Sequence, residues 1–339
     1  MLRVRAARKN DIDAFVSLAK AAGAGFTSLA VGRDDLAMRL EKSEAAFATP
    51  SPGEGELTYQ MMLEDTESGE ILGCSAVKSA VGVSKPYYDF KIITLAQSSK
   101  EADRRFDMDV MILVNDFAGC SEVGTLFVGE GARGRGAGRL VAQTRYLLIA
   151  ADYDRFGPHV LAELRGVVRE DGSSPFFDHV TRPFFRMSFE EADRLSAASD
   201  NQFILDLMPK HPIYLDILPD AAREVLGQTH AQGGGARALL EWEGFTYNKY
   251  VDIFDGGPLM SVPTREARTG RESRVMTVGA GGGEVDAIVT TDRFDDFRAV
   301  HTQVSLKDGT VSISSDAQRA LGLESGSKAR VWSANNVDG

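Results

Sequence analysis

The stretch Glu122-Val-Gly-Thr-Leu-Phe-Val128, followed by Gly129-Glu-Gly-Ala-Arg-Gly-Arg-Gly-Ala-Gly138, decides the fold. An apolar run rich in β-branched residues leads directly into a glycine-rich loop, and apolar residues at helical spacing continue from Gly138 to Ala150. This order predicts a strand, a loop and a long helix. Such a loop presents unpaired backbone N–H groups and the positive end of a helix dipole, so it predicts a site for phosphate groups.

The segments around this loop predict an α/β (α+β) fold with a mixed, largely antiparallel sheet. The pattern predicts helices up to Lys20 and over 34–47, and strands over 2–6, 58–63, 71–77, 111–114 and 160–164. The turn Asp65-Thr-Glu-Ser-Gly69 joins two of these strands into a hairpin. Hairpins before the glycine loop are not typical of the strict βαβ alternation of a doubly wound sheet.

A chain of 339 residues is too long for one ordinary core, and four parts are expected. Residues 1–190 contain the glycine loop, and 191–258 form a second α/β segment. Residues 259–285 are rich in Ser, Thr, Arg and Gly, which predicts a linker or mobile loop. Short β signals over 286–339 predict a small β-rich C-terminal domain.

Composition excludes several classes of function. The net charge of −11 and the isoelectric point near 5.1 argue against sequence-independent nucleic-acid binding, which needs a basic face. No signal-peptide pattern and no bilayer-spanning apolar run is visible, so we expect a cytoplasmic protein with no membrane partner. The only cysteines, Cys74 and Cys120, are too few for a disulfide scaffold and are expected to be buried thiols.

The glycine loop has several possible interpretations. Residues 129–134 match G-x-G-x-x-G, with Asp152 and Asp154 about 20 residues later, as in NAD-binding oxidoreductases, but the preceding hairpins do not suit that fold. No Lys-Ser/Thr closes a P-loop. A simple solvated turn also remains open. The fourth pattern, Arg133-x-x-Gly136-x-Gly138, resembles the pyrophosphate-binding loop of the GNAT superfamily of N-acyltransferases.

A wider set of segments resembles the arginine N-succinyltransferase family. The segments of this chain match the family in the same order through about residue 258, and the match continues more weakly to about residue 333. The segments are Thr27-Ser-Leu29, 121–128, Ala162-Glu-Leu-Arg-Gly166, Ser174-Pro-Phe-Phe177, Leu207-Met-Pro-Lys-His-Pro-Ile-Tyr214, 236–245 and Asp252-Ile-Phe-Asp-Gly-Gly-Pro258. Ala30 stands where the family has Pro, and 259–285 is unusually long and glycine-rich. The resemblance implies a GNAT-like, acyl-CoA-binding fold over 1–190, with the catalytic histidine in 191–258.

Transfer of an acyl group from a thioester to an amine needs a proton carrier, and histidine suits this role near neutral pH. The chain has five histidines. His179 lies in an aromatic-rich stretch that predicts core packing, while His159, His211 and His301 lie near strands or turns. His230, in Gly227-Gln-Thr-His230, ends a helical pattern and enters a glycine loop.

The resemblance assigns the proton donor to His230, which would protonate the departing CoA sulfur. It also implies that Leu126 contacts succinyl-CoA and that Arg133, Gly136 and Gly138 hold the pyrophosphate. Succinyl-CoA would be the acyl donor, with no metal and no redox cofactor.

The second substrate is L-arginine, whose guanidinium group needs a carboxylate of the protein as its partner. The carboxylate of L-arginine and that of the succinyl group each need an Arg or Lys side chain. Asp252, Asp255 and Glu163 are candidates for the first role, and Arg165 and Lys210 for the second. Each of these charged residues is also expected, more often, to be structural or solvated.

The implied reaction is the succinylation of L-arginine by succinyl-CoA, the first step of arginine catabolism by the succinyltransferase route. Alternatives are a related acyltransferase that uses acetyl-CoA or ornithine, a partner-dependent subunit, and an NAD-binding enzyme. The resemblance also implies a homo-oligomer or a hetero-oligomer with a related subunit.

Overall fold

The computed structural model describes residues 1–23, 29, 31–49, 55–169 and 171–334. The quoted residues 27, 28 and 30 therefore lie outside the described part. The chain divides into two compact units, each assembled from separate segments. Unit 1 contains Met1–Ala80, Ser121–Pro158 and Pro263–Gly339, and unit 2 contains Val81–Cys120 and His159–Val262. The expected four-part division follows the sequence order, whereas these units interleave along it.

Unit 1 is built on a mixed, largely antiparallel sheet, as expected. Its strand order is β12-β15-β11-β14-β13-β1-β2-β3-β6. Among the pairings in this unit, β11 and β14 run parallel, and β1 pairs antiparallel with both β2 and β13. The strands are β1 (Leu2–Ala6), β2 (Thr58–Asp65), β3 (Ile71–Lys78), β6 (Ser121–Val128), β11 (Arg274–Ala280), β12 (Val285–Thr291), β13 (Arg298–Lys307), β14 (Thr310–Ile313) and β15 (Lys328–Trp332).

The helices of unit 1 cover this sheet with apolar faces. They are α1 (Ile12–Ala22), α2 (Arg33–Ala48), α3 (Ala137–Ala151), α9 (Arg268–Glu272) and α10 (Ser315–Leu321). Phe15 of α1 and Leu40 of α2 pack with Met62 and Cys74 of the sheet in one buried cluster. Cys74 and Cys120 are buried free thiols, as predicted, and burial raises the pKa of Cys74 to about 12.

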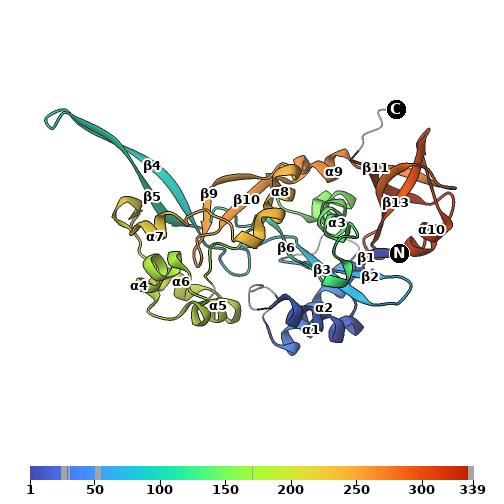
Figure 1. The fold of residues 1–339 in the computed structure, drawn as a ribbon, viewed down its shortest axis with the longest axis horizontal. Helices are drawn as coiled ribbons and strands as arrows, with labels where there is room; N and C mark the ends of the chain where they lie inside the picture. The colour runs from blue at the N-terminus through green and yellow to red at the C-terminus, as the bar shows by residue number, and fades with distance from the viewer. Residues whose placement is uncertain (24–28, 30, 50–54, 170, 335–339) are drawn as a thin grey trace. The chain divides into compact units, whose positions relative to one another are not determined.

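The C-terminal segments are integral to unit 1. Residues 259–285, for which the sequence predicts a linker, begin with most of strand β10 (Pro258–Pro263), which belongs to unit 2, and continue into helix α9 and strand β11 of unit 1. Backbone pairing and burial order this stretch, because Val262, Ala267 and Val278 are all buried. In Figure 1 strand β13 lies beside β1, with which it pairs in the register Arg3↔Val300.

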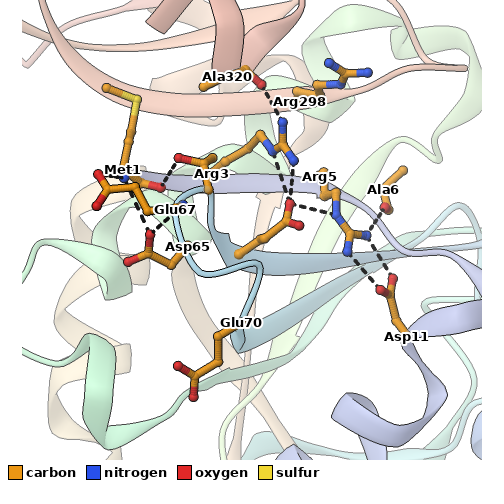
Figure 2. A network of polar contacts seen from close by, with 12 residues as sticks. Met1, Arg3, Arg5, Ala6, Asp11, Asp65, Glu67, Glu70, Arg298 and Ala320 are labelled. Carbon is orange, nitrogen blue, oxygen red and sulfur yellow. Dashed lines mark hydrogen bonds and ion pairs between the residues drawn. The ribbon is translucent and has the colours of Figure 1, made fainter. Parts of the chain in front are cut away.

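A partly buried ion-pair network joins β1 to its neighbours (Figure 2). Arg5 donates two hydrogen bonds of 2.8 Å to the carboxylate of Asp11, and its Nε donates to Glu64 at 3.0 Å. Arg3 also donates to Glu64, and it reaches the carbonyl of Ala320 in α10 at 2.9 Å. The network therefore ties the first strand to both β2 and the C-terminal helix.

Unit 2 contains a six-strand order of β7-β10-β9-β4-β5-β8 among its described residues. Strands β4 and β5 pair along their whole length as the long hairpin seen in Figure 1. Its main core is formed by aromatic and aliphatic side chains from the sheet and helices, including Phe90, Met111, Phe176 and Ile204. The elements are β4 (Asp89–Ser99), β5 (Arg104–Val114), β7 (His159–Glu163), β8 (Ile213–Tyr214), β9 (Thr246–Asp252), β10, α4 (Arg182–Phe185), α5 (Phe189–Ala198), α6 (Gln202–Leu207), α7 (Asp220–Arg223) and α8 (Gly234–Glu243).

Candidate functional site

In unit 1 the strand, glycine loop and helix predicted from the sequence are β6, residues 129–136 and α3. Gly129 leaves β6 with its N–H donating to the carbonyl of Leu72 at 2.8 Å, and a short 3-10 turn, Glu130–Ala132, follows. Gly136 then starts α3 in the left-handed conformation, with φ of 74°. Helix α3 is almost wholly buried from Leu140 to Ala150, which fixes its first turn rigidly to the unit.

The loop leaves space beside its backbone. Gly134 and Gly136 both have positive φ, so a side chain there would strain the backbone. A Cβ on Gly134, Gly136 or Gly138 would meet no atom within 4 Å. Open space next to backbone N–H groups at the start of a long helix suits a diphosphate group.

The basic side chains of this loop differ in their surroundings. Arg133 is exposed and lies 3.9 Å from Glu130, a weak contact, whereas Arg135 donates to Asp65 at 3.1 Å. Arg133 therefore has the freedom to reach an anion, while Arg135 helps to fix the loop to β2.

Strand β6 is irregular where Leu126 lies. Thr125 has a φ of 52°, which is unusual for a β-branched residue, and the pairing of β6 with β3 shifts between Cys74 and Ala76. Leu126 follows this bulge and is half-buried. A bulge interrupts the ladder and exposes backbone groups, which allows an extended chain to pair with the strand.

In unit 2, His230 lies on a segment held by backbone hydrogen bonds. Its N–H donates to the carbonyl of Arg165 at 2.8 Å, and its own carbonyl accepts from Gly233 at 2.7 Å, just before α8. Gly227, three residues earlier, has a φ of 69° and donates its N–H to the carbonyl of Gly256 at 2.8 Å. The side chain of His230 is half-buried.

The other histidines are more exposed than His230. His159, His179, His211 and His301 all lie at the surface of their units. The expectation that His179 packs in the core is wrong, because the π-helical turn Phe177–Thr181 buries Phe177 and Val180 and leaves His179 outside. His230 is therefore the histidine whose backbone is fixed and whose side chain is partly shielded.

The turn between β9 and β10 contains two carboxyl groups. Asp252 accepts hydrogen bonds at one oxygen from the N–H groups of Phe254 and Asp255, at 2.7 and 2.8 Å. Asp255 accepts from Gly257 at Oδ1 and from Gly166 at Oδ2, both at 2.8 Å. With both oxygens occupied by backbone donors, Asp255 is structural rather than a group open to a ligand.

Burial raises the pKa of both carboxyl groups. For Asp252, removal from water is the largest cause, and the nearby charges of Asp255 and Glu163 add to it. For Asp255, removal from water also dominates and raises the pKa, while the two backbone donors oppose the rise. A hydrogen bond from the side chain of Asp252 also opposes the rise in the pKa of Asp255.

The remaining charged candidates lie in unit 2. Glu163 ends β7 with an exposed side chain, Arg165 follows it half-buried, and Lys210 is exposed on the turn after α6. The structure thus brings Asp252, Asp255, Arg165 and the His230 segment together within unit 2. Leu126, Arg133, Gly136 and Gly138 are together within unit 1.

Two glycines near His230 were missed by sequence reasoning. A Cβ on Gly257 would lie 2.1 Å from the carbonyl oxygen of Leu164, and one on Gly166 would lie 2.3 Å from that of Asp255. Only glycine allows these two segments to approach so closely. The adjacent glycines after Asp255 are the available signal in the sequence, but Gly166 lies 89 residues before Asp255 along the chain.

Within the described ranges, no group of three His, Cys, Asp or Glu side chains is arranged to hold a metal ion. Among the same residues, no helix is long and apolar enough to cross a membrane.

Known proteins match the chain over almost its whole length. The family described as arginine N-succinyltransferase beta subunit matches residues 2–269, and the C-terminal domain of that subunit matches 271–333. The arginine N-succinyltransferase of Yersinia enterocolitica is 38% identical over 98% of both chains, and that of Escherichia coli is 36% identical over 98% of this chain and 97% of its own. The solved structure of arginine/ornithine succinyltransferase subunit AI from Pseudomonas aeruginosa covers 98% of each chain, with 33% identity and a TM-score of 0.88.

Proposed function

Because the chain belongs to the arginine N-succinyltransferase family, we propose that it transfers the succinyl group of succinyl-CoA to the α-amino group of L-arginine. The products are N2-succinyl-L-arginine and CoA. The observation that carries this proposal is the match to enzymes of this name at 36–39% identity, which extends over 98% of the chain for the first of them.

Unit 1 supplies the proposed acyl-CoA site. The backbone N–H groups of Gly136 and Gly138 and the side chain of Arg133 bind the pyrophosphate. This assignment is supported by the open space at both glycines and by the exposure of Arg133. The irregular strand at Leu126 pairs with the pantetheine amides and directs the thioester along β6.

His230 in unit 2 supplies the proposed proton donor. The amine nitrogen attacks the thioester carbonyl carbon, a C–N bond forms, and the C–S bond breaks as CoA leaves. The imidazolium of His230 then gives its proton to the thiolate, and the neutral imidazole accepts the proton released by the amine. Two backbone hydrogen bonds at His230 support this role because they fix the position of its backbone.

The charged residues of unit 2 supply the proposed arginine site. Asp255 and Asp252 both accept from backbone donors, and burial raises the pKa of each, so Glu163, whose side chain is exposed, is the carboxylate proposed for the guanidinium. Arg165 and Lys210 are proposed for the substrate carboxylate and the succinyl tail.

Ornithine is a second proposed acceptor, and a related subunit is a proposed partner. The name of the Pseudomonas aeruginosa structure includes ornithine and describes a subunit. Ornithine carries the same α-amino group with an ammonium in place of the guanidinium. A planar guanidinium forms two parallel hydrogen bonds with a carboxylate, so the proposal favours arginine.

The experiment measures thiol release by the purified protein with succinyl-CoA or acetyl-CoA against arginine, ornithine and lysine. We expect the largest kcat/KM for succinyl-CoA with arginine, and a 100- to 10,000-fold lower kcat for His230→Asn, the range that general acid–base catalysis contributes. His179→Asn is the matched control, because His179 is an exposed histidine of the same unit. Release with acetyl-CoA only would contradict the proposed donor.

A chain that releases no thiol with any pair would indicate that activity requires the proposed partner subunit. Size-exclusion chromatography coupled to light scattering then measures its oligomeric state, and addition of a co-expressed related subunit tests whether activity needs a partner.

A further inference from the structure

The segment that carries His230 is attached to the rest of unit 2 at two backbone points. At its start, Gly227 donates its N–H to the carbonyl of Gly256, in the turn between β9 and β10. At its end, the N–H of His230 donates to the carbonyl of Arg165, which lies just after β7. Both distances are 2.8 Å. The position of His230 therefore depends on where these two acceptors lie.

One side chain fixes both acceptors. The carboxylate of Asp255 accepts from Gly257, the neighbour of Gly256, and from Gly166, the neighbour of Arg165. Asp255 is only 8% exposed, so water does not compete for these bonds. The missing side chains at Gly166 and Gly257 allow the two backbones to lie in direct contact around the carboxylate.

From this arrangement we propose that Asp255 is a positioning residue for His230. The carboxylate holds the turn at Gly256 and the strand end at Arg165 in one fixed geometry, and these two carbonyls hold Gly227 and His230. The inference rests on the proposed role of His230 as proton donor. Displacement of a catalytic group by about 1 Å lowers a rate by about 100-fold, so loss of this support lowers kcat.

Asp255→Asn tests the inference with little change in volume. The carboxamide oxygen replaces one acceptor, but its NH₂ group faces the N–H of Gly166 or Gly257, so one of the two backbone bonds is lost. We expect kcat to fall 10- to 100-fold, with the KM for succinyl-CoA unchanged because the glycine loop lies in unit 1. Hydrogen–deuterium exchange is expected to rise in peptides that cover 226–233.

Ile204→Val is the matched control for a general loss of stability. Ile204 is buried in the core of unit 2 on α6, outside the His230 segment and its anchors. We expect this variant to lower the melting temperature while leaving kcat and exchange at 226–233 near the wild-type values. An equal loss of kcat in Ile204→Val would overturn the inference.

A double-mutant cycle with His230→Ala separates positioning from other roles. If Asp255 acts through His230, Asp255→Asn costs little further rate once His230 is absent. Additive losses, or an active Asp255→Asn beside an inactive His230→Ala, would overturn the inference and leave the proposed function intact. Full activity of His230→Ala would overturn the proposed role of His230 itself, and the positioning role with it.

Discussion

The two acidic residues of the β9–β10 turn differ in what they do, although they are three positions apart. Asp255 accepts from backbone N–H groups of two different segments, whereas Asp252 accepts at one oxygen from two residues of its own turn. Asp252 has a pKa above that of the unfolded chain, so the folded protein binds the proton more tightly. Stability from this group is fully present below the unfolded pKa of about 4 and is lost as pH rises through the folded pKa.

Asp252→Asn is therefore expected to make stability less dependent on pH. The amide keeps the oxygen that accepts from Phe254 and Asp255, and its NH₂ mimics the protonated carboxyl group toward Asp255. Urea unfolding at pH 5 and pH 8 measures the free energy of unfolding of both proteins. In the wild type, one such group changes this free energy by up to about 1.4 kcal/mol per pH unit.

Asp171→Asn is the control for this prediction. Asp171 is exposed, and its hydrogen bonds from Ser173 lower its pKa, so its contribution has the opposite sign and is lost only in acid. An equal change in the free energy of unfolding between pH 5 and pH 8 for the wild type and for Asp252→Asn would contradict the prediction.

At the residue scale, the local sequence predicts the glycine loop that lies between β6 and α3. The role of His230 comes from the family resemblance of its Gly-Gln-x-His segment and stays a prediction. The sequence is insufficient for Asp255. The two backbone donors of Asp255 come from different segments, one of them 89 residues earlier, and no periodicity reports such a contact. A carboxylate before two glycines reads equally well as a ligand and as a turn residue.

At the scale of elements, the loop between β6 and α3 depends on glycines for two separate reasons. Gly136 needs its left-handed conformation, with φ of 74°, so Gly136→Ala costs about 1 kcal/mol of stability in addition to any effect on binding. Gly138 lies in the first turn of α3, does not have such a positive φ, and has open space beside it.

Gly138→Ala is therefore expected to separate ligand contact from backbone strain. Alanine favours the helix by about 0.5–1 kcal/mol, so the melting temperature holds or rises, while the KM for succinyl-CoA rises about tenfold if the diphosphate lies against this position. Differential scanning fluorimetry and initial-rate kinetics measure the two effects. An unchanged KM with a raised melting temperature would contradict the proposed phosphate site.

Element types agree with the sequence where the pattern is strong, as at 2–6, 58–63, 71–77 and 122–128. Strand β5 extends well before the predicted run 111–114, because its first half lies in the exposed hairpin, where both faces are polar or half-exposed. Residues 259–285 also differ from the sequence-based expectation of a linker. Their polar, glycine-rich sequence is ordered because its strands pair with distant ones, as β11 does with β14 and β15.

At the scale of the whole molecule, the C-terminal segments fall within unit 1 and pair with its first strand. Besides the pairing of β13 with β1, the ring of Phe294 packs edge-on against Tyr59 at 5.1 Å between centroids. The sequence could not indicate this, since pairing across such a separation leaves no local signal.

Truncation after Gly270, at the boundary between the two family matches, tests this assignment. The cut exposes one edge of β1 and removes the contact of Phe294 with Tyr59. We therefore expect unit 1 to lose its cooperative thermal transition and the protein to aggregate. Truncation after Ala334 is the control and is expected to retain the wild-type melting temperature. A monomeric protein ending at Gly270 with that same melting temperature would contradict the assignment.

The bond from Arg3 to Ala320 spans 317 residues, which has a consequence for biosynthesis. At roughly 5–20 residues per second, the ribosome needs on the order of 15 to 60 s after the first strand to deliver its C-terminal partners, β13 and α10. During that interval the nascent chain displays an unpaired β edge. Yield in a heterologous host is therefore governed by chaperone supply and growth temperature as much as by the stability of the finished protein.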